Sequence, residues 1–206
     1  IDKFTFTIPF LASSLDAVVS PAFAISLDKM GGLAVLNLEG IYTRHDDPDS
    51  IIKEITQAPQ EKATSLLQKI YSTPIKENLI GKMVETIKNC GANCAISLTP
   101  ANTKRLAPIA VEAGADLLFI QSTVTTARHI SKSETGLNIS DICSTVKIPV
   151  VVGNTVTYQA TLELMDAPVD SISDSRGGYN ISGCSFSVTE LVTEISKLIN
   201  QFECTY

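Results

Sequence analysis

An α/β fold built from strand-then-helix units is predicted from three features of this 206-residue sequence. Six short apolar runs, rich in Val, Ile, Leu and Ala, have the length and composition of buried strands. Segments with helical spacing of apolar residues separate these runs. Hydrophobic residues make up 44% of the chain and aromatic residues 6%, which is typical of an ordinary globular core. Because tight hairpins cannot join parallel strands, helical crossovers imply a parallel sheet, either a barrel or an open sheet.

Three units are predicted in the N-terminal half of the chain. Their helices end at Gly31-Gly32 and at Gly114, because glycine adopts the backbone conformation that closes a helix. The stretch between residues 49 and 90 is too long for one crossover helix and has helical spacing throughout, so two or three helices fill it. The strands are expected at residues 8–12, 33–36 and 95–98, and the helices after the first and third at 21–30 and 102–113.

Three further units are predicted in the C-terminal half. A Gly/Ser-rich loop over residues 173–187 then precedes a last amphipathic helix over 188–202. A complete eight-unit barrel typically needs about 250 residues, so residues 1–206 supply a single incomplete barrel domain without strands seven and eight. The strands are expected at residues 116–120, 149–152 and 169–172, and the helices between them at 139–146 and 157–167.

The charge balance and the cysteines narrow the functional classes. A net charge of −6 argues against nucleic acid as a partner, because phosphate binding needs clustered Lys and Arg. No apolar run reaches the roughly 18 residues of a membrane span, and no targeting signal is found, so a cytoplasmic protein without membrane contact is expected. The five cysteines are scattered and odd in number, which favours reduced thiols. Cys90 and Cys94 lack a second Cys or His pair, so no metal site is expected.

Four stretches near the ends of predicted strands carry a more specific signal. They are residues 8–19 (IPFLASSLDAVV), 31–40 (GGLAVLNLEG), 113–121 (AGADLLFIQ) and 152–157 (VGNTVT). In their order and on their strands, these stretches resemble the IMP dehydrogenase/GMP reductase superfamily, nearest to its IMP dehydrogenase-related branch without the regulatory CBS insertion. The resemblance implies a (β/α)8 TIM barrel, here truncated to about six units.

The resemblance also implies ligands, namely a purine nucleotide (IMP, GMP or XMP) over the C-terminal mouth of the barrel and NAD or NADP beside it. The family's serine loop after strand one points to Ser13 and Ser14 as substrate contacts. The alternative is that Ser14 to Asp16 cap the following helix. Gly153 and Asn154 match the family's asparagine loop after strand five, and the alternative there is a simple turn.

The family's cofactor-binding position and its catalytic cysteine match this sequence less closely. Gln121 and Ser122 occupy the cofactor-binding position, where IMP dehydrogenases carry an Asp, and Gln121 lacks that charge. The family's catalytic cysteine attacks the purine ring from a Gly-rich loop after strand six. Cys184 is the candidate here, although its spacing and the residue after it depart from the family pattern. The alternative is an incidental thiol in a flexible loop.

Two functions therefore stay open. One is NAD(P)-dependent oxidation of IMP to XMP, or reductive deamination of GMP to IMP, through a Cys184 adduct. The other is a shortened, non-catalytic relative that acts as a structural or regulatory binding protein, because the family's phosphate site uses loops after strands seven and eight. An incomplete barrel exposes strand edges, so a homo-oligomer or a partner is expected to cover the open edge. The charged run over residues 44–47 is interpreted as a solvated helix start rather than a ligand contact.

Overall fold

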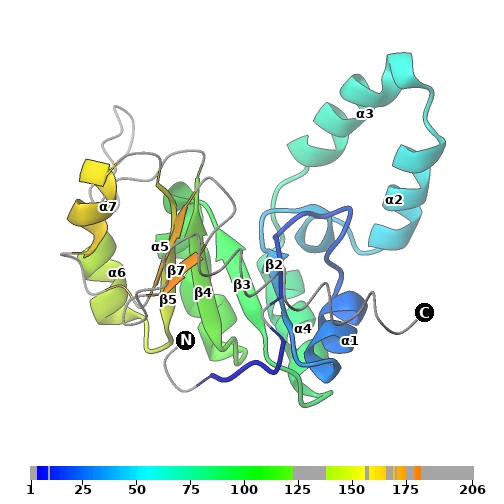
Figure 1. Ribbon diagram of the computed structural model, residues 1–206. Helices are drawn as coiled ribbons and strands as arrows, with labels where there is room; N and C mark the ends of the chain where they lie inside the picture. The colour runs from blue at the N-terminus through cyan, green and yellow to red at the C-terminus, as the bar shows by residue number, and fades with distance from the viewer. Residues whose placement is uncertain are drawn as a thin grey trace, which may run out of the picture.

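A computed structural model describes residues 4–8, 10–122, 138–155, 158–165, 169, 171–174 and 179–181. Its strands form one sheet in which each strand pairs with the next along the chain (Figure 1). β1 to β6 are parallel, and β7 pairs antiparallel to β6. Sequential parallel order is that of a (β/α) barrel, since an open doubly wound sheet reverses its strand order. The strands are β1 Leu11–Ala12, β2 Leu33–Asn37, β3 Ala95–Leu98, β4 Leu117–Gln121, β5 Val150–Thr155, β6 Ser171–Asp174 and β7 Tyr179–Ile181.

The helices follow from local capping signals. Ser20 caps the first helix by accepting a hydrogen bond from the Phe23 amide, and a proline opens that helix. Gly31 and Gly114 have φ values of 92° and 102°, so both stop signals predicted from the sequence are confirmed. In the described part of the chain, no helix is both long and apolar enough to cross a bilayer. The helices are α1 Pro21–Lys29, η1 Ile41–Thr43, α2 Pro48–Gln57, α3 Gln60–Ser72, α4 Glu77–Lys88, α5 Pro100–Glu112, α6 Ile139–Thr145 and α7 Tyr158–Met165.

β2, β3 and β4 are buried on both faces, as expected of a parallel sheet covered by helices. Successive residues of a strand point to opposite faces, so β2 to β5 each contribute to two separate apolar clusters. The larger cluster packs the outer face of the sheet against helices such as α4, whose Ile80 and Ile87 are fully buried. The smaller cluster lies on the inner face and contains Leu33, Val35, Ala95, Leu117, Phe119 and Val151, with Phe4, Phe6 and Leu11 packed against it.

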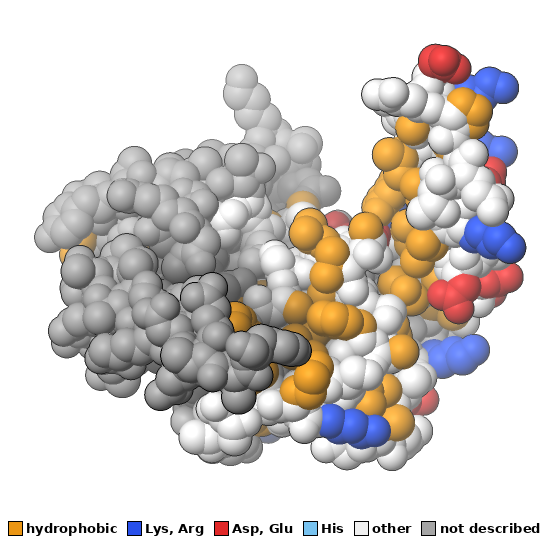
Figure 2. Space-filling model, turned by 45° about the vertical axis from the view of Figure 1, so that its right-hand side comes forward, with side chains coloured by type: hydrophobic (Ala, Val, Ile, Leu, Met, Phe, Trp, Pro, Cys, Tyr) orange, Lys and Arg blue, Asp and Glu red, His pale blue; other side chains and the backbone are white. Residues whose placement is uncertain are grey.

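The α2–α3 hairpin extends away from the barrel (Figure 1). α2 has no buried residue, and Ile70 is the buried residue of α3. Figure 2 shows apolar side chains along one side of this hairpin and Lys, Asp and Glu side chains along the other. The expectation of two or three helices between residues 49 and 90 is therefore confirmed, and two of them form an outlying hairpin rather than a crossover.

Several local predictions need correction. Ser20, not the Ser14 to Asp16 segment, caps α1. Gly153 and Asn154 lie within β5, which pairs with neighbours on both sides, so neither a loop nor the alternative of a simple turn begins at these residues. β7 falls inside the stretch predicted as a Gly/Ser-rich loop, because Tyr179–Ile181 pairs with β6 and tertiary pairing overrides the loop-like composition. The final helix predicted over residues 188–202 lies outside the described residues.

Candidate functional site

Polar residues gather where the parallel strands end. Ser13 follows β1, Asn37 ends β2, Thr99 follows β3, Gln121 ends β4 and Asn154 lies near the end of β5. The carboxyl ends of parallel strands share one edge of the sheet, so these positions ring the same mouth. This is the edge at which (β/α) barrels place their active sites.

The loop after β1 reaches the end of β4. The Ser14 hydroxyl donates a hydrogen bond of 2.8 Å to the Gln121 Oε1 atom. In a flat sheet, three inter-strand spacings would separate β1 from β4 by about 14 Å. Curvature of the sheet is what brings the two ends within reach of two side chains. A predicted substrate contact and a predicted cofactor contact therefore touch each other.

The ends of β4 and β5 are joined through their backbones. The Ser122 amide donates to the Gly153 carbonyl at 2.9 Å, and the Asn154 amide donates to the Ser122 carbonyl at 3.1 Å. Gln121 pairs in register with Gly153. The peptide bond between Gly153 and Asn154 is cis. Four of the predicted site residues are thus held side by side at this part of the mouth, whereas Ser13 is exposed on the β1 loop.

Asp16 organises the β1 loop, a role that differs from the helix cap considered for it from the sequence. Its carboxylate accepts hydrogen bonds from Asn37 Nδ2 at 3.1 Å, the Ile41 amide at 2.9 Å and the Tyr71 hydroxyl at 2.5 Å. Gly40 lies so close that a Cβ there would be 1.9 Å from Asp16 Oδ1. Asp16 and Gly40 fall in two of the four stretches that carry the family resemblance, which was the available signal. No local pattern marks Tyr71.

The ring of Tyr71 lies in an environment that disfavours ionisation. Partial burial raises the pKa of Tyr71, and the hydrogen bond to Asp16 and its negative charge raise that pKa further. The Arg44 guanidinium, 5.9 Å from the ring centroid, opposes the shift. Tyr71 is therefore a neutral donor to Asp16 at physiological pH.

The charged run over residues 44–47 has a structural role, as its interpretation as a helix start predicted. Asp47 caps α2 with its side chain. Arg44 donates to the Thr73 carbonyl, and a ring nitrogen of His45 lies 3.2 Å from the Ile70 carbonyl. These contacts hold the C-terminal end of α3 against the loop that follows β2.

Glu39 links the ends of β2 and β3. Its carboxylate accepts from the Thr99 amide at 2.5 Å and from Asn102 Nδ2 at 2.7 Å, at the start of α5. A carboxylate at a helix N-terminus satisfies amides that lack a partner within the helix. Glu39 is thus engaged in holding the mouth together.

The thiols of the described cysteines do not suit a nucleophile at this mouth. Cys94 directly precedes β3, at the opposite end of the strands, and is fully buried. Its burial, with a smaller contribution from the Asp116 charge, raises the pKa of Cys94 to about 12, so its thiol stays protonated and inert. Cys90 is exposed near the end of α4, and Cys143 is half-buried in α6. Cys184, the predicted nucleophile, lies outside the described residues.

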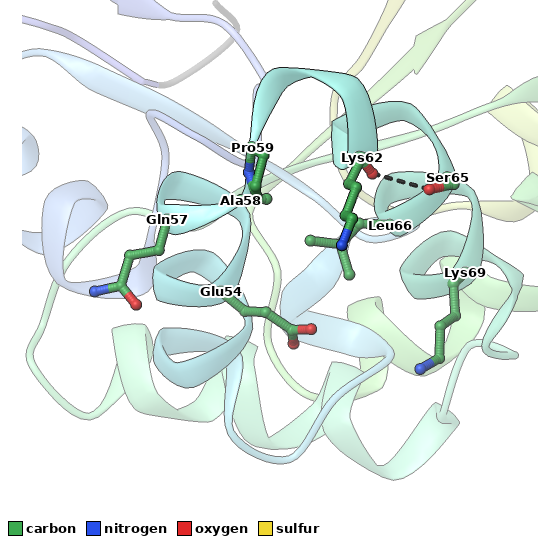
Figure 3. A pocket seen from close by; sticks show the side chains of 8 residues that line it. All are labelled: Glu54, Gln57, Ala58, Pro59, Lys62, Ser65, Leu66 and Lys69. Atoms are coloured by element: carbon green, nitrogen blue, oxygen red, sulfur yellow. Dashed lines mark hydrogen bonds between the residues drawn. The ribbon is translucent and has the colours of Figure 1, made fainter.

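A hollow of about 580 Å³ lies on the α2–α3 hairpin rather than at the strand ends. Its walls come from the facing parts of α2 and α3 and their connection (Figure 3). None of the predicted site residues lines it. Among the described residues, no group of three or more His, Cys, Asp or Glu side chains is placed to hold a metal ion. The strand ends, rather than this hollow, form the candidate site.

Comparisons with known proteins identify the family of the chain. The family model described as the IMP dehydrogenase / GMP reductase domain matches residues 1–195. A crystal structure of an IMP dehydrogenase/GMP reductase-like protein from Corynebacterium glutamicum superposes with a TM-score of 0.77 at 32% identity, over 84% of this chain and 46% of that chain.

Two curated relatives extend the comparison. An uncharacterized oxidoreductase of Mycobacterium tuberculosis is 38% identical over 170 residues, which cover 80% of this chain and 45% of the relative. The inosine-5'-monophosphate dehydrogenase of Cryptosporidium parvum is 28% identical over 189 residues, covering 84% of this chain and 44% of that protein. The chain thus spans about half the length of the curated relatives it matches. The family model matches nearly the whole length of the chain. The chain therefore belongs to the IMP dehydrogenase/GMP reductase family.

Proposed function

We propose that this chain forms the nucleotide-binding part of an NAD(P)-dependent oxidoreductase that acts on a purine nucleotide, converting IMP to XMP or GMP to IMP. Family membership and relatives described as oxidoreductases support the redox class. The observation that carries the proposal is the hydrogen bond between Ser14 and Gln121, because it joins the two ends of the mouth that the family uses for substrate and cofactor.

The proposed roles follow from the chemistry of each side chain. Ser13, Ser14 and Asn154 would bind the nucleotide, since hydroxyl and amide groups both donate to and accept from ribose and purine atoms. Gln121 and Ser122 would hold the nicotinamide cofactor. A neutral amide can pair with ribose hydroxyls through donor and acceptor atoms alike, so Gln121 fits this position without the charge of an Asp. The bound cofactor supplies the hydride acceptor or donor.

Cys184 is the proposed nucleophile. XMP differs from IMP by one oxygen on C2 of the purine, so the thiolate would add to that carbon. The C2 hydrogen leaves with its electron pair, and water then displaces the sulfur to give XMP and the regenerated thiol. In the reductive direction, the sulfur adds to C2 of GMP, ammonia leaves, and a hydride to C2 displaces the sulfur to give IMP.

The first test is thermal unfolding of the purified chain with and without millimolar IMP, GMP or XMP. A ligand that binds the native state stabilises it by about 2.7 kcal/mol at a hundredfold excess over Kd, so a raised melting temperature is expected for at least one nucleotide. Asn154→Ala should abolish that shift. Ser144→Ala is the matched control, because its hydroxyl bonds a carbonyl of its own helix, α6, at 2.8 Å.

A second test separates catalysis from binding. Cys184→Ala should keep the nucleotide-induced shift while turnover, followed by the absorbance of reduced nicotinamide, disappears. Turnover retained by Cys184→Ala would remove the thiol from the mechanism. No shift with any of the three nucleotides would favour the alternative, a non-catalytic relative whose open sheet edge is covered by a partner or a second copy.

A further inference from the structure

The α2–α3 hairpin is attached to the barrel mainly through polar contacts at its base. α2 has no buried residue, and Ile70 is the buried residue that α3 provides. Its apolar side therefore contributes little to holding it in place (Figure 2). The polar contacts at the end of α3 determine where the hairpin sits.

One of these contacts reaches the loop of the candidate site. The Tyr71 hydroxyl donates to Asp16 Oδ2 at 2.5 Å, across 55 residues of chain. Asp16 lies two residues after Ser14, whose hydroxyl donates to Gln121. A continuous path of hydrogen bonds and a short loop thus runs from α3 through the β1 loop to the end of β4.

Among the hydrogen-bond donors to Asp16, only the Tyr71 hydroxyl described above comes from α3. Asn37 and the Ile41 amide bind the same carboxylate from the β2 side. Gly40 has no Cβ and so leaves space for the carboxylate against its backbone. Without the Tyr71 hydroxyl, Asp16 would keep two donors but lose the one that ties the loop to α3.

We propose that Tyr71 is a positioning residue of the nucleotide site, which fixes the loop carrying Ser13 and Ser14 by donating its hydroxyl to Asp16. The proposal rests on the proposed function and assigns the α2–α3 hairpin a part in it. The nucleotide then binds to a preorganised loop, so less conformational entropy of the loop is lost on binding. Tyr71 itself acts through Asp16 and touches no reacting atom.

The test compares Tyr71→Phe with Ser72→Ala. Tyr71→Phe removes only the hydroxyl and keeps the ring beneath Arg44. Ser72→Ala removes a neighbouring hydroxyl that bonds within α3, to the Lys69 carbonyl at 2.7 Å. Both variants should fold with melting temperatures close to that of the unaltered protein.

Two readouts are expected to separate the variants. Hydrogen exchange of the Leu15, Val18 and Val19 amides, which are bonded within the β1 loop, should become severalfold faster in Tyr71→Phe and stay unchanged in Ser72→Ala. The Kd for the stabilising nucleotide should rise about three- to tenfold in Tyr71→Phe only, as for loss of one ordinary hydrogen bond.

The outcomes distinguish this inference from the proposed function. Exchange and Kd in Tyr71→Phe equal to those of Ser72→Ala would overturn the positioning role while nucleotide binding stands. If the unaltered protein binds none of the three nucleotides, the proposed function fails and the role of Tyr71 in a nucleotide site fails with it. The exchange readout would then still decide whether Tyr71 holds the loop.

Discussion

The Ser14 hydroxyl and the Gln121 amide oxygen are joined by a hydrogen bond of 2.8 Å across 107 residues of chain. One side chain belongs to the loop predicted to bind substrate and the other to the strand end predicted to bind cofactor. A substitution at either position should therefore affect the conformation of the other.

A double-mutant cycle tests this coupling. Ser14→Ala and Gln121→Ala should each lower the free energy of unfolding, and the double variant should fall short of their sum by about 1 kcal/mol, as expected for one part-buried hydrogen bond. Urea unfolding followed by circular dichroism gives the three differences. Additive effects would mean that the contact contributes nothing to stability.

A pair of glycine substitutions tests the close packing of Gly40 against Asp16. Gly40→Ala would place a Cβ 1.9 Å from the Asp16 carboxylate, so the carboxylate must leave its position and the protein should lose about 2 kcal/mol or more. Gly81→Ala is the matched control, because a Cβ at this position of α4 would meet nothing within 4 Å outside its own helix backbone.

The stability of the Gly81→Ala control should change in the opposite direction. Alanine in a helix interior is favoured over glycine by about 0.5–1 kcal/mol, so Gly81→Ala is expected to stabilise the protein. Urea midpoints of the two variants, measured in parallel, give the comparison. Equal midpoints would contradict the close approach of Gly40 to Asp16.

Alkaline pH should destabilise the fold through Cys94. Burial raises the pKa of its thiol to about 12, whereas the unfolded thiol titrates near pH 8.5. The contribution is fully present below about pH 8.5 and is lost as the pH rises toward 12, because the unfolded state releases its proton first. The free energy of unfolding should fall by up to about 1.4 kcal/mol per pH unit above pH 9.

Cysteine variants isolate that contribution. Cys94→Ala should be less stable at neutral pH, because it leaves a cavity, but its stability should fall less steeply between about pH 9 and 10. Cys90→Ala removes an exposed thiol and should keep the slope of the unaltered protein. Parallel slopes in all three proteins would show that folding does not raise the pKa of Cys94.

Thiol labelling tests the proposed nucleophile. Iodoacetamide at neutral pH should modify Cys184, and a bound purine nucleotide should slow that reaction. Cys90, exposed near the end of α4, should be modified at a rate that the nucleotide does not change. Cys94 should stay unmodified until the protein unfolds. Peptide mass mapping separates the three rates, and nucleotide-independent labelling of Cys184 would place it away from the site.

Much of the barrel could be predicted because its strands are local, continuous apolar runs. The third strand was predicted at residues 95–98, where β3 lies, since both of its faces are buried and every residue is apolar or small. β7 could not be predicted in this way. Its residues Tyr179–Ile181 pair with β6 although Gly and Ser surround them, and composition says nothing about that long-range partner.

The strand-end positions of the candidate residues were predicted from the sequence, but the contacts between them were not. Ser14, Gln121 and Asn154 came from the resemblance of strand-end stretches to a known family, and strand ends mark the mouth of a barrel. The contact of Tyr71 with Asp16 depends on where an outlying hairpin folds back, which no periodicity encodes. The cap of α1 could not be assigned from the sequence either. Ser20 caps this helix, although Ser14 and Asp16 have side chains that can cap in the same way.

The α2–α3 hairpin also affects the entropy cost of pairing neighbouring strands during folding. Leu11 pairs with Leu33, a separation of 22 residues, whereas Val35 pairs with Ala95, a separation of 60. Closing the longer loop costs about 0.9 kcal/mol more chain entropy, from the logarithm of the ratio of the two lengths. Joining β2 to β3 is therefore the entropically costlier of these two steps. The insertion that places Tyr71 at the barrel mouth also widens the sequence gap between neighbouring strands.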